Sequence, residues 1–171
     1  HEAVEIFYEL YKETAKRDGI AIHKKEYYKN LIDLAKNYND ITITVYIARH
    51  ENDNLAAIVA LFTKNEAVYL YGASADKKRN LMPSYLLQWT VIQDAKKTGI
   101  EVYDFYGLPP TNDKNHPMHG LYRFKTGFGG TIIHTVGSVD VKNSAFYFPY
   151  IVAEALRSWY HKKVKKFFVG R

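Results

Sequence analysis

The chain has 171 residues, of which 47% are hydrophobic and 15% aromatic, enough to form the core of one domain of ordinary size. It contains no cysteine, which excludes disulfides, thiol catalysis and cysteine-based metal sites. The net charge of +6 comes from the segment after residue 156, because the other 18 basic residues balance the 18 acidic ones. A basic end on a neutral body is suited to nucleic acid or anionic lipid, although the solvated end of a last helix would have the same composition.

The two ends of the chain carry little targeting information. No apolar run approaches the roughly 20 residues that span a bilayer, and the first residues do not form a signal peptide. The chain begins with His1 rather than Met, so we expect it to be trimmed or to be part of a longer protein.

Two helices and three strands are predicted in the first half. Apolar residues at helical spacing predict helices from Glu2 to about Arg17 and from Lys24 to Lys36. Three strand-like segments follow, Ile41–Arg49, Leu55–Thr63 and Glu66–Gly72, and the short polar turns between them favour antiparallel hairpins. The middle segment is almost continuously apolar, which is typical of a strand covered on both faces.

A helix and a strand are predicted next. A polar loop, Ala73–Asn80, leads into a helix from Met82 to Lys97, with Pro83 in a first turn that tolerates it. Glu101–Tyr106 is predicted to be a strand, and Gly107–Gly120 is a loop rich in Pro, Asn and His.

The chain is predicted to end with a strand and a helix. Ile132–Val141 has the composition of a last strand, and Ser144 can cap a helix that runs to about Phe168. The element order predicts an α+β fold over residues 1–171, with a mixed, mostly antiparallel sheet flanked by helices. This order matches the acyltransferase fold of the GNAT type.

The segment His116–Gly130 is the most distinctive part of the sequence. Three of its last four residues are glycines, which permit unusual backbone angles, and Phe128 among them can stack on a base or ring. Arg123 and Lys125 flank Phe124, and in an extended segment they would project to the same face. Two cations beside an aromatic ring suit a sugar–phosphate ligand. The alternative is a turn with solvated basic side chains.

Asp104 is a candidate proton acceptor in the segment Tyr103–Gly107. It lies late in a predicted strand, and in open sheets ligands collect beyond the carboxyl ends of strands. A carboxylate among apolar neighbours can have a raised pKa and accept a proton from an attacking amine. Equally, Asp104 can serve only as a hydrogen-bond acceptor for backbone or tyrosine hydroxyl groups.

Neither a cofactor nor a metal is expected. The loop Tyr71–Asn80 leads into a helix N-terminus, where acetyl-CoA enzymes of the GNAT type bind pyrophosphate with an Arg/Gln-x-x-Gly-x-Gly/Ala pattern. That pattern is absent, which disfavours acetyl-CoA. His116 and His119 lie three residues apart without a third ligand nearby in the sequence.

Three segments resemble the FemABX peptidyltransferases: Arg79–Trp89, Tyr103–Gly107 and, most specifically, Gly120–Gly130. The resemblance covers roughly residues 55–145. It implies transfer of an amino acid, usually Gly, Ala or Ser, from its tRNA ester to the side-chain amine of residue three of the peptidoglycan stem peptide. The ester is already activated, so no ATP is required. The implied partners are aminoacyl-tRNA and a nucleotide- or lipid-linked muramyl peptide.

The resemblance also implies roles for individual residues. The family's Phe-Lys pair falls on Phe124 and Lys125, and the lysine is implicated in handling the tRNA end and in the transfer. Four further residues are implied to bind the precursor: Tyr103 and Tyr106 near the strand end, and Arg79 and Tyr85 for its phosphates.

Members of the family normally carry two GNAT-like domains, and this chain resembles the second, C-terminal one. We therefore expect an N-terminal domain to be missing, and the basic end Lys162–Arg171 to contribute to tRNA binding. We expect a cytoplasmic protein at the inner face of the membrane, and the aromatic last helix is suited to a peripheral lipid contact. The alternatives are another GNAT-type acyltransferase acting on a protein or small-molecule amine, and a non-catalytic module that binds tRNA or precursor.

Overall fold

The computed structural model describes residues 2–109 and 112–160. It divides into two units, His1–Gly129 and Gly130–Arg171, which are considered separately below. Among the described residues, no helix is both long enough and apolar enough to cross a membrane.

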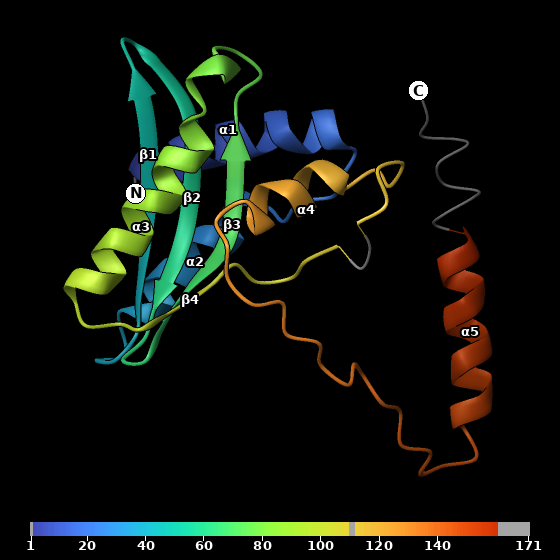
Figure 1. Cartoon of the computed structure of the whole chain (residues 1–171). Coiled ribbons are helices and arrows are strands. Elements are labelled where there is room, and N and C mark those ends of the chain that lie inside the picture. The colour runs from blue at the N-terminus through green and yellow to red at the C-terminus, as the bar shows by residue number, and fades with distance from the viewer. Residues whose placement is uncertain (1, 110–111, 161–171) are drawn as a thin grey trace. The chain divides into compact units, whose positions relative to one another are not determined.

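A four-stranded sheet forms the centre of the first unit. Its strands are β1 (Thr42–His50), β2 (Asp53–Phe62), β3 (Glu66–Ser74) and β4 (Val102–Asp104), and they are neighbours in that order. The first three are antiparallel, and β4 pairs in parallel with β3 over three residues. The predicted mixed, mostly antiparallel sheet is therefore confirmed, as are the two hairpins (Figure 1).

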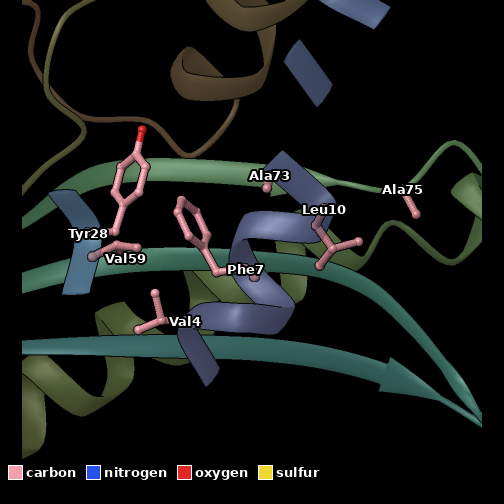
Figure 2. Packing of buried hydrophobic residues seen from close by; sticks show 8 residues of the cluster. Val4, Phe7, Leu10, Tyr28, Val59, Ala73 and Ala75 are labelled. Atoms are coloured by element: carbon pink, nitrogen blue, oxygen red, sulfur yellow. The ribbon is translucent and has the colours of Figure 1, made fainter. Parts of the chain in front are cut away.

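Helices cover both faces of this sheet, as the continuous apolar character of β2 indicates. Helices α1 (Glu2–Asp18) and α2 (Lys25–Ala35) lie on one face and α3 (Pro83–Lys97) on the other, after a short 3₁₀ helix, Arg79–Leu81 (Figure 1). Figure 2 shows the core on the α1 side, where Phe7 and Tyr28 are almost completely buried. The α+β fold with flanking helices is thus confirmed.

Because β3 contains a bulge, two nearby tyrosines lie on opposite faces of the sheet. Val59 pairs with Tyr71 and Ala60 pairs with Tyr69, so Leu70 is an extra residue without a partner on β2. Side chains in a regular strand alternate, and residues two apart share a face. Because of the bulge, Tyr71 packs in the core beneath α1, whereas Tyr69 packs in the core beneath α3.

The glycine-rich segment contains a helix, α4 (His119–Thr126), rather than the predicted extended chain. Residues two positions apart on a helix are rotated by about 200° around its axis, so Arg123 and Lys125 do not share a face. Lys125 is buried and Arg123 is exposed. Leu121, Phe124 and Phe128 recur at positions i, i+3 and i+7, which is the spacing of one helix face, but the glycines around them obscure this pattern. Gly129 ends this region in the left-handed conformation, with φ of 79°.

The second unit contains helix α5 (Tyr147–Trp159) after an irregular segment. The predicted strand Ile132–Val141 is wrong, because residues 131–143 form neither strand nor helix. A strand requires a hydrogen-bonded neighbour, and the described part of this unit contains none to pair with it. The Ser144 hydroxyl accepts the Phe146 N–H at 3.2 Å, just before α5, and the predicted continuation of the helix to Phe168 lies outside the described residues.

Candidate functional site

The candidate site lies where β4 separates from β3. Their parallel pairing ends at Val68 and Asp104, while β3 continues to Ser74. The chain after β4 turns away through Tyr106, whose φ of 60° is in the left-handed region. The divergence leaves the backbone carbonyls that follow β4 without sheet partners, at the strand end where ligands collect in open sheets.

Lys125 of α4 fills this divergence. Its side chain is 7% exposed, and Nζ donates hydrogen bonds to the carbonyl oxygens of Phe105 at 2.7 Å and Gly107 at 2.6 Å. Burial lowers the pKa of Lys125 below its usual 10.5, and the nearby Asp104 carboxylate opposes that effect. A lysine ammonium has three donors, so these two carbonyls leave one N–H unused. The alternative of a turn with solvated basic side chains is therefore wrong for Lys125, whereas Arg123 is exposed.

An aromatic cluster lies next to the lysine, because Phe105, whose carbonyl accepts Nζ, is one of its members. The Phe128 ring lies 5.5 Å from that of Tyr85, 5.6 Å from that of Phe124 and 5.2 Å from that of Phe105, measured between centroids. The Tyr103 ring is 4.9 Å from Phe105. Of the residues selected from the sequence, Lys125, Phe124, Phe128, Tyr85 and Tyr103 are thus brought together. Tyr85 is 38% exposed, so the cluster reaches the surface.

Asp104 lies beside Lys125 but is itself exposed. Its Oδ1 accepts the backbone N–H of Tyr106 at 2.6 Å, which holds the turn after β4. The sequence left two interpretations of Asp104 open, a proton acceptor in catalysis or a hydrogen-bond acceptor for the backbone, and this bond corresponds to the second. The role of proton acceptor stays a prediction.

The remaining predicted residues do not join the cluster around Lys125. Arg79 is exposed and forms an ion pair with Asp76 at 3.1 Å, and Arg123 is exposed on α4. The Tyr106 side chain is 65% exposed. The roles of Arg79 and Tyr106 in binding the precursor, and of Arg123 in binding a sugar–phosphate ligand, stay predictions.

The loop between β3 and α3 is not a free anion site. Lys77 and Lys78 form ion pairs with Asp53, and Lys78 also pairs with Glu51. These carboxylates of the β1–β2 hairpin neutralise the cations that precede the helix. Among the described residues, no three His, Asp or Glu side chains gather as metal ligands, and His116 Nδ1 accepts the Met118 N–H.

Sequence reasoning missed Tyr69 and Gln88, which lie below Lys125. Nζ of Lys125 is 5.4 Å from the centroid of the Tyr69 ring. The Gln88 side chain is completely buried, and its Oε1 accepts the Tyr103 hydroxyl. The signal for Gln88 was a polar residue in phase with the buried Val91 and Ala95 of α3, whereas no sequence signal reveals the bulge that places Tyr69 here.

The model of the FemAB family matches this chain over residues 1–49 and 34–155. A protein named Lipid II:glycine glycyltransferase, from Staphylococcus saprophyticus subsp. saprophyticus, is 30% identical over 133 residues, which are 77% of this chain and 32% of that protein. The protein of the same name from Staphylococcus haemolyticus is 31% identical over 107 residues, which are 61% of this chain and 26% of that protein. The chain thus spans no more than 32% of the length of either relative.

Two solved structures share the fold. A crystal structure of FemX superposes with a TM-score of 0.62 and 20% identity, covering 72% of this chain and 47% of that one. An aminoglycoside acetyltransferase, meta-AAC0020, from an uncultured soil metagenomic sample gives a TM-score of 0.53 and 15% identity, covering 81% and 87%. The sheet therefore has the GNAT-type arrangement. Because the family model matches most of the sequence, the chain belongs to the FemAB family.

Proposed function

We propose that this chain takes part in aminoacyl transfer from aminoacyl-tRNA to the stem peptide of a peptidoglycan precursor. The observation that carries the proposal is the buried Lys125 ammonium, held by two carbonyls at the end of β4 with one donor left over. The names of the relatives make glycine and the lipid-linked precursor the first pair to test.

The arrangement suits aminolysis of an ester. The precursor amine attacks the ester carbonyl, the new C–N bond forms, and the bond to the ribose oxygen breaks. Negative charge develops first on the carbonyl oxygen and then on the leaving oxygen. A preorganised ammonium in a water-poor site stabilises such charge without reorganising at that moment. The lowered pKa of Lys125 also makes its proton easier to give to the leaving ribose oxygen. The proton that the attacking amine releases then returns to Lys125, so the lysine ends the reaction in its charged form.

The aromatic cluster is suited to hold the tRNA end. Tyr85, Phe124 and Phe128 reach from the interior to the surface beside Lys125, and such rings bind bases by stacking. Tyr103 and Asp104 lie at the end of β4, close to the lysine, where the precursor amine would approach.

The decisive experiment follows labelled glycine from charged tRNA onto nucleotide-linked and lipid-linked precursors. Lys125→Met should lower the transfer rate at least about 100-fold, the lower range for loss of a positioned acid or base. Lys16→Met, an exposed lysine of α1, is the matched control and should keep the wild-type rate. Equal rates in the two variants would remove Lys125 from the reaction. Retention of charged tRNA without transfer, in the unsubstituted chain, would instead identify a binding module.

A further inference from the structure

A buried polar group lies beneath the candidate site, on the side away from solvent. Gln88 of α3 is completely buried, and its Oε1 accepts the Tyr103 hydroxyl at 2.5 Å. Its Nε2 has no hydrogen-bond partner among the described residues. An unsatisfied buried amide costs free energy, and an apolar side chain of the same shape would avoid that cost. The oxygen of Gln88 thus satisfies the Tyr103 hydroxyl, whereas stability does not explain the unpaired Nε2.

Tyr69 connects this amide to Lys125. The phenol packs in the core beneath α3, and the face of its ring lies under the Lys125 ammonium, with 5.4 Å from Nζ to the ring centroid. Burial raises the pKa of Tyr69 to about 12, and the Gln88 side chain partly opposes that rise. The phenol is thus neutral at physiological pH, and its ring presents an uninterrupted π face to the cation.

The position of the ring is strongly restricted. A Cβ added at Gly72 would lie 1.7 Å from the Tyr69 hydroxyl oxygen, so this hydroxyl occupies the space that the glycine leaves open. Gln88 approaches from α3, and the bulge at Leu70 turns the ring toward that helix. Two elements of the fold, β3 and α3, therefore fix the position of this ring.

A ring face under an ammonium favours the charged form, by roughly 0.5–2 kcal/mol depending on solvent access. Burial of Lys125 acts in the opposite direction, and Asp104 from β4 acts in the same direction as the ring. The titratable groups that face Nζ from the surrounding strands are thus Asp104 and the phenol of Tyr69, with Tyr103 next to them. Of these, only Tyr69 lies directly under the nitrogen.

We propose that Tyr69 and Gln88 are positioning residues for Lys125: Gln88 anchors the phenol rings of Tyr69 and Tyr103, and the Tyr69 ring holds the ammonium in its charged form at the divergence of β3 and β4. Neither residue touches a substrate. The influence of these two residues on the transfer rate rests on the proposed function, whereas their influence on the charge state of Lys125 does not.

The test measures the pKa of Lys125 by NMR in the full chain labelled with ¹³C and ¹⁵N at lysine, with Lys125→Met used to assign its signal. Tyr69→Met fills most of the space without a ring, and it should lower the pKa of Lys125 by about half a unit to one unit. Tyr69→Phe keeps the ring and should leave the pKa near the wild-type value. Gln88→Met keeps the shape of the side chain and should produce a smaller fall, because the ring loses its anchor.

Gln93→Met is the matched control, since Gln93 is exposed on the same helix and should not change the titration of Lys125. If the Tyr69→Met protein does not fold, as judged by circular dichroism, the comparison of Gln88→Met with Gln93→Met decides. An unchanged pKa of Lys125 in every folded variant would overturn the positioning role.

With active enzyme, the pH profile of transfer should move to lower pH with the NMR titration. Absence of transfer in the wild-type chain would contradict only the proposed function.

Discussion

The Tyr69 hydroxyl lies in the space beside Gly72 where any other residue would have its Cβ, only 1.7 Å from that position. Both residues belong to β3 and face α3, and the tyrosine ring is enclosed by Gln88 and the Lys125 side chain. Gly72 is therefore required by its neighbour rather than by its own backbone angles.

Gly72→Ala should destabilise the protein by about 1–3 kcal/mol, because the added methyl group must displace a confined ring. Adding Tyr69→Phe removes the closest atom and should recover part of this loss, although the ring carbon at 2.7 Å is still too close. Urea denaturation of both single variants and the double variant measures the coupling. Gly120→Ala is the control, since a Cβ there meets nothing within 4 Å. Additive losses would mean that Tyr69 does not fill this space.

Phe128→Ala should open the aromatic cluster beside Lys125. The ring contacts Tyr85, Phe105 and Phe124, and a half-buried phenylalanine with three ring contacts contributes about 2 kcal/mol. We expect that loss in the free energy of unfolding from urea titration, and a smaller loss for Phe128→Leu, which keeps most of the apolar volume. Equal losses in the two variants would show that the ring contacts contribute nothing beyond burial.

Tyr28→Phe should make the protein more tolerant of alkali. Burial raises the pKa of Tyr28 to about 12 in the folded chain, from the ordinary value of 10.0. Its contribution to stability is therefore complete below pH 10 and is lost as the pH rises toward 12, because the unfolded chain releases its proton first. Because the Tyr28 side chain is only 2% exposed, we expect this titration to lower the free energy of unfolding by about 2 kcal/mol between pH 10 and pH 12.

Tyr46 and Tyr69 have pKa values raised to about 12 in the same way, so the wild-type protein should lose stability steeply above pH 10. The measurement is the free energy of unfolding from pH 8 to pH 12, with tyrosinate absorbance followed in parallel. The Tyr28→Phe curve should fall less steeply than the wild-type curve. Parallel curves would show that Tyr28 titrates normally in the folded state.

Glu5→Gln should weaken the dependence of stability on acid. Glu5 of α1 accepts hydrogen bonds from Lys25 and pairs with Lys29, both of α2 at 2.7 Å, and these bonds lower its pKa to about 2. A lowered carboxyl pKa contributes stability above pH 4.5 that disappears as the pH falls toward 2. The midpoint of thermal unfolding, measured between pH 6 and pH 2, should fall less in the variant. The effect should be small and should shrink in high salt, since these side chains are partly accessible to solvent.

Much of the fold could be predicted from local patterns. The helical spacing in α1 and α2, the alternation in β1 and the apolar run of β2 each report burial on particular faces, and the structure has those elements within one or two residues. The strand predicted at Ile132–Val141 is wrong because composition measures the preference of a segment but not the presence of a partner strand.

The candidate site was predicted in part. Lys125, Phe124 and Phe128 lie together, but the reason differs from the one first considered. Phe124 and Lys125 are adjacent in α4, and Phe128 follows the helix in a turn in which its N–H bonds to the Lys125 carbonyl, so its ring returns to that of Phe124. Tyr69 could not have been identified, since its orientation depends on one unpaired residue in β3, and long-range polar contacts such as the one between Gln88 and Tyr103 leave no periodic signal.

The bulge in β3 also has a consequence for how this family can vary in length. Leu70 is the residue without a partner, so its deletion would restore a regular ladder in which Ala60 still opposes Tyr69 and Val59 still opposes Tyr71. Neither tyrosine would change sides. A homologue one residue shorter at this point is therefore compatible with the same two cores, and an alignment gap there would not mean that the site below Lys125 has been lost.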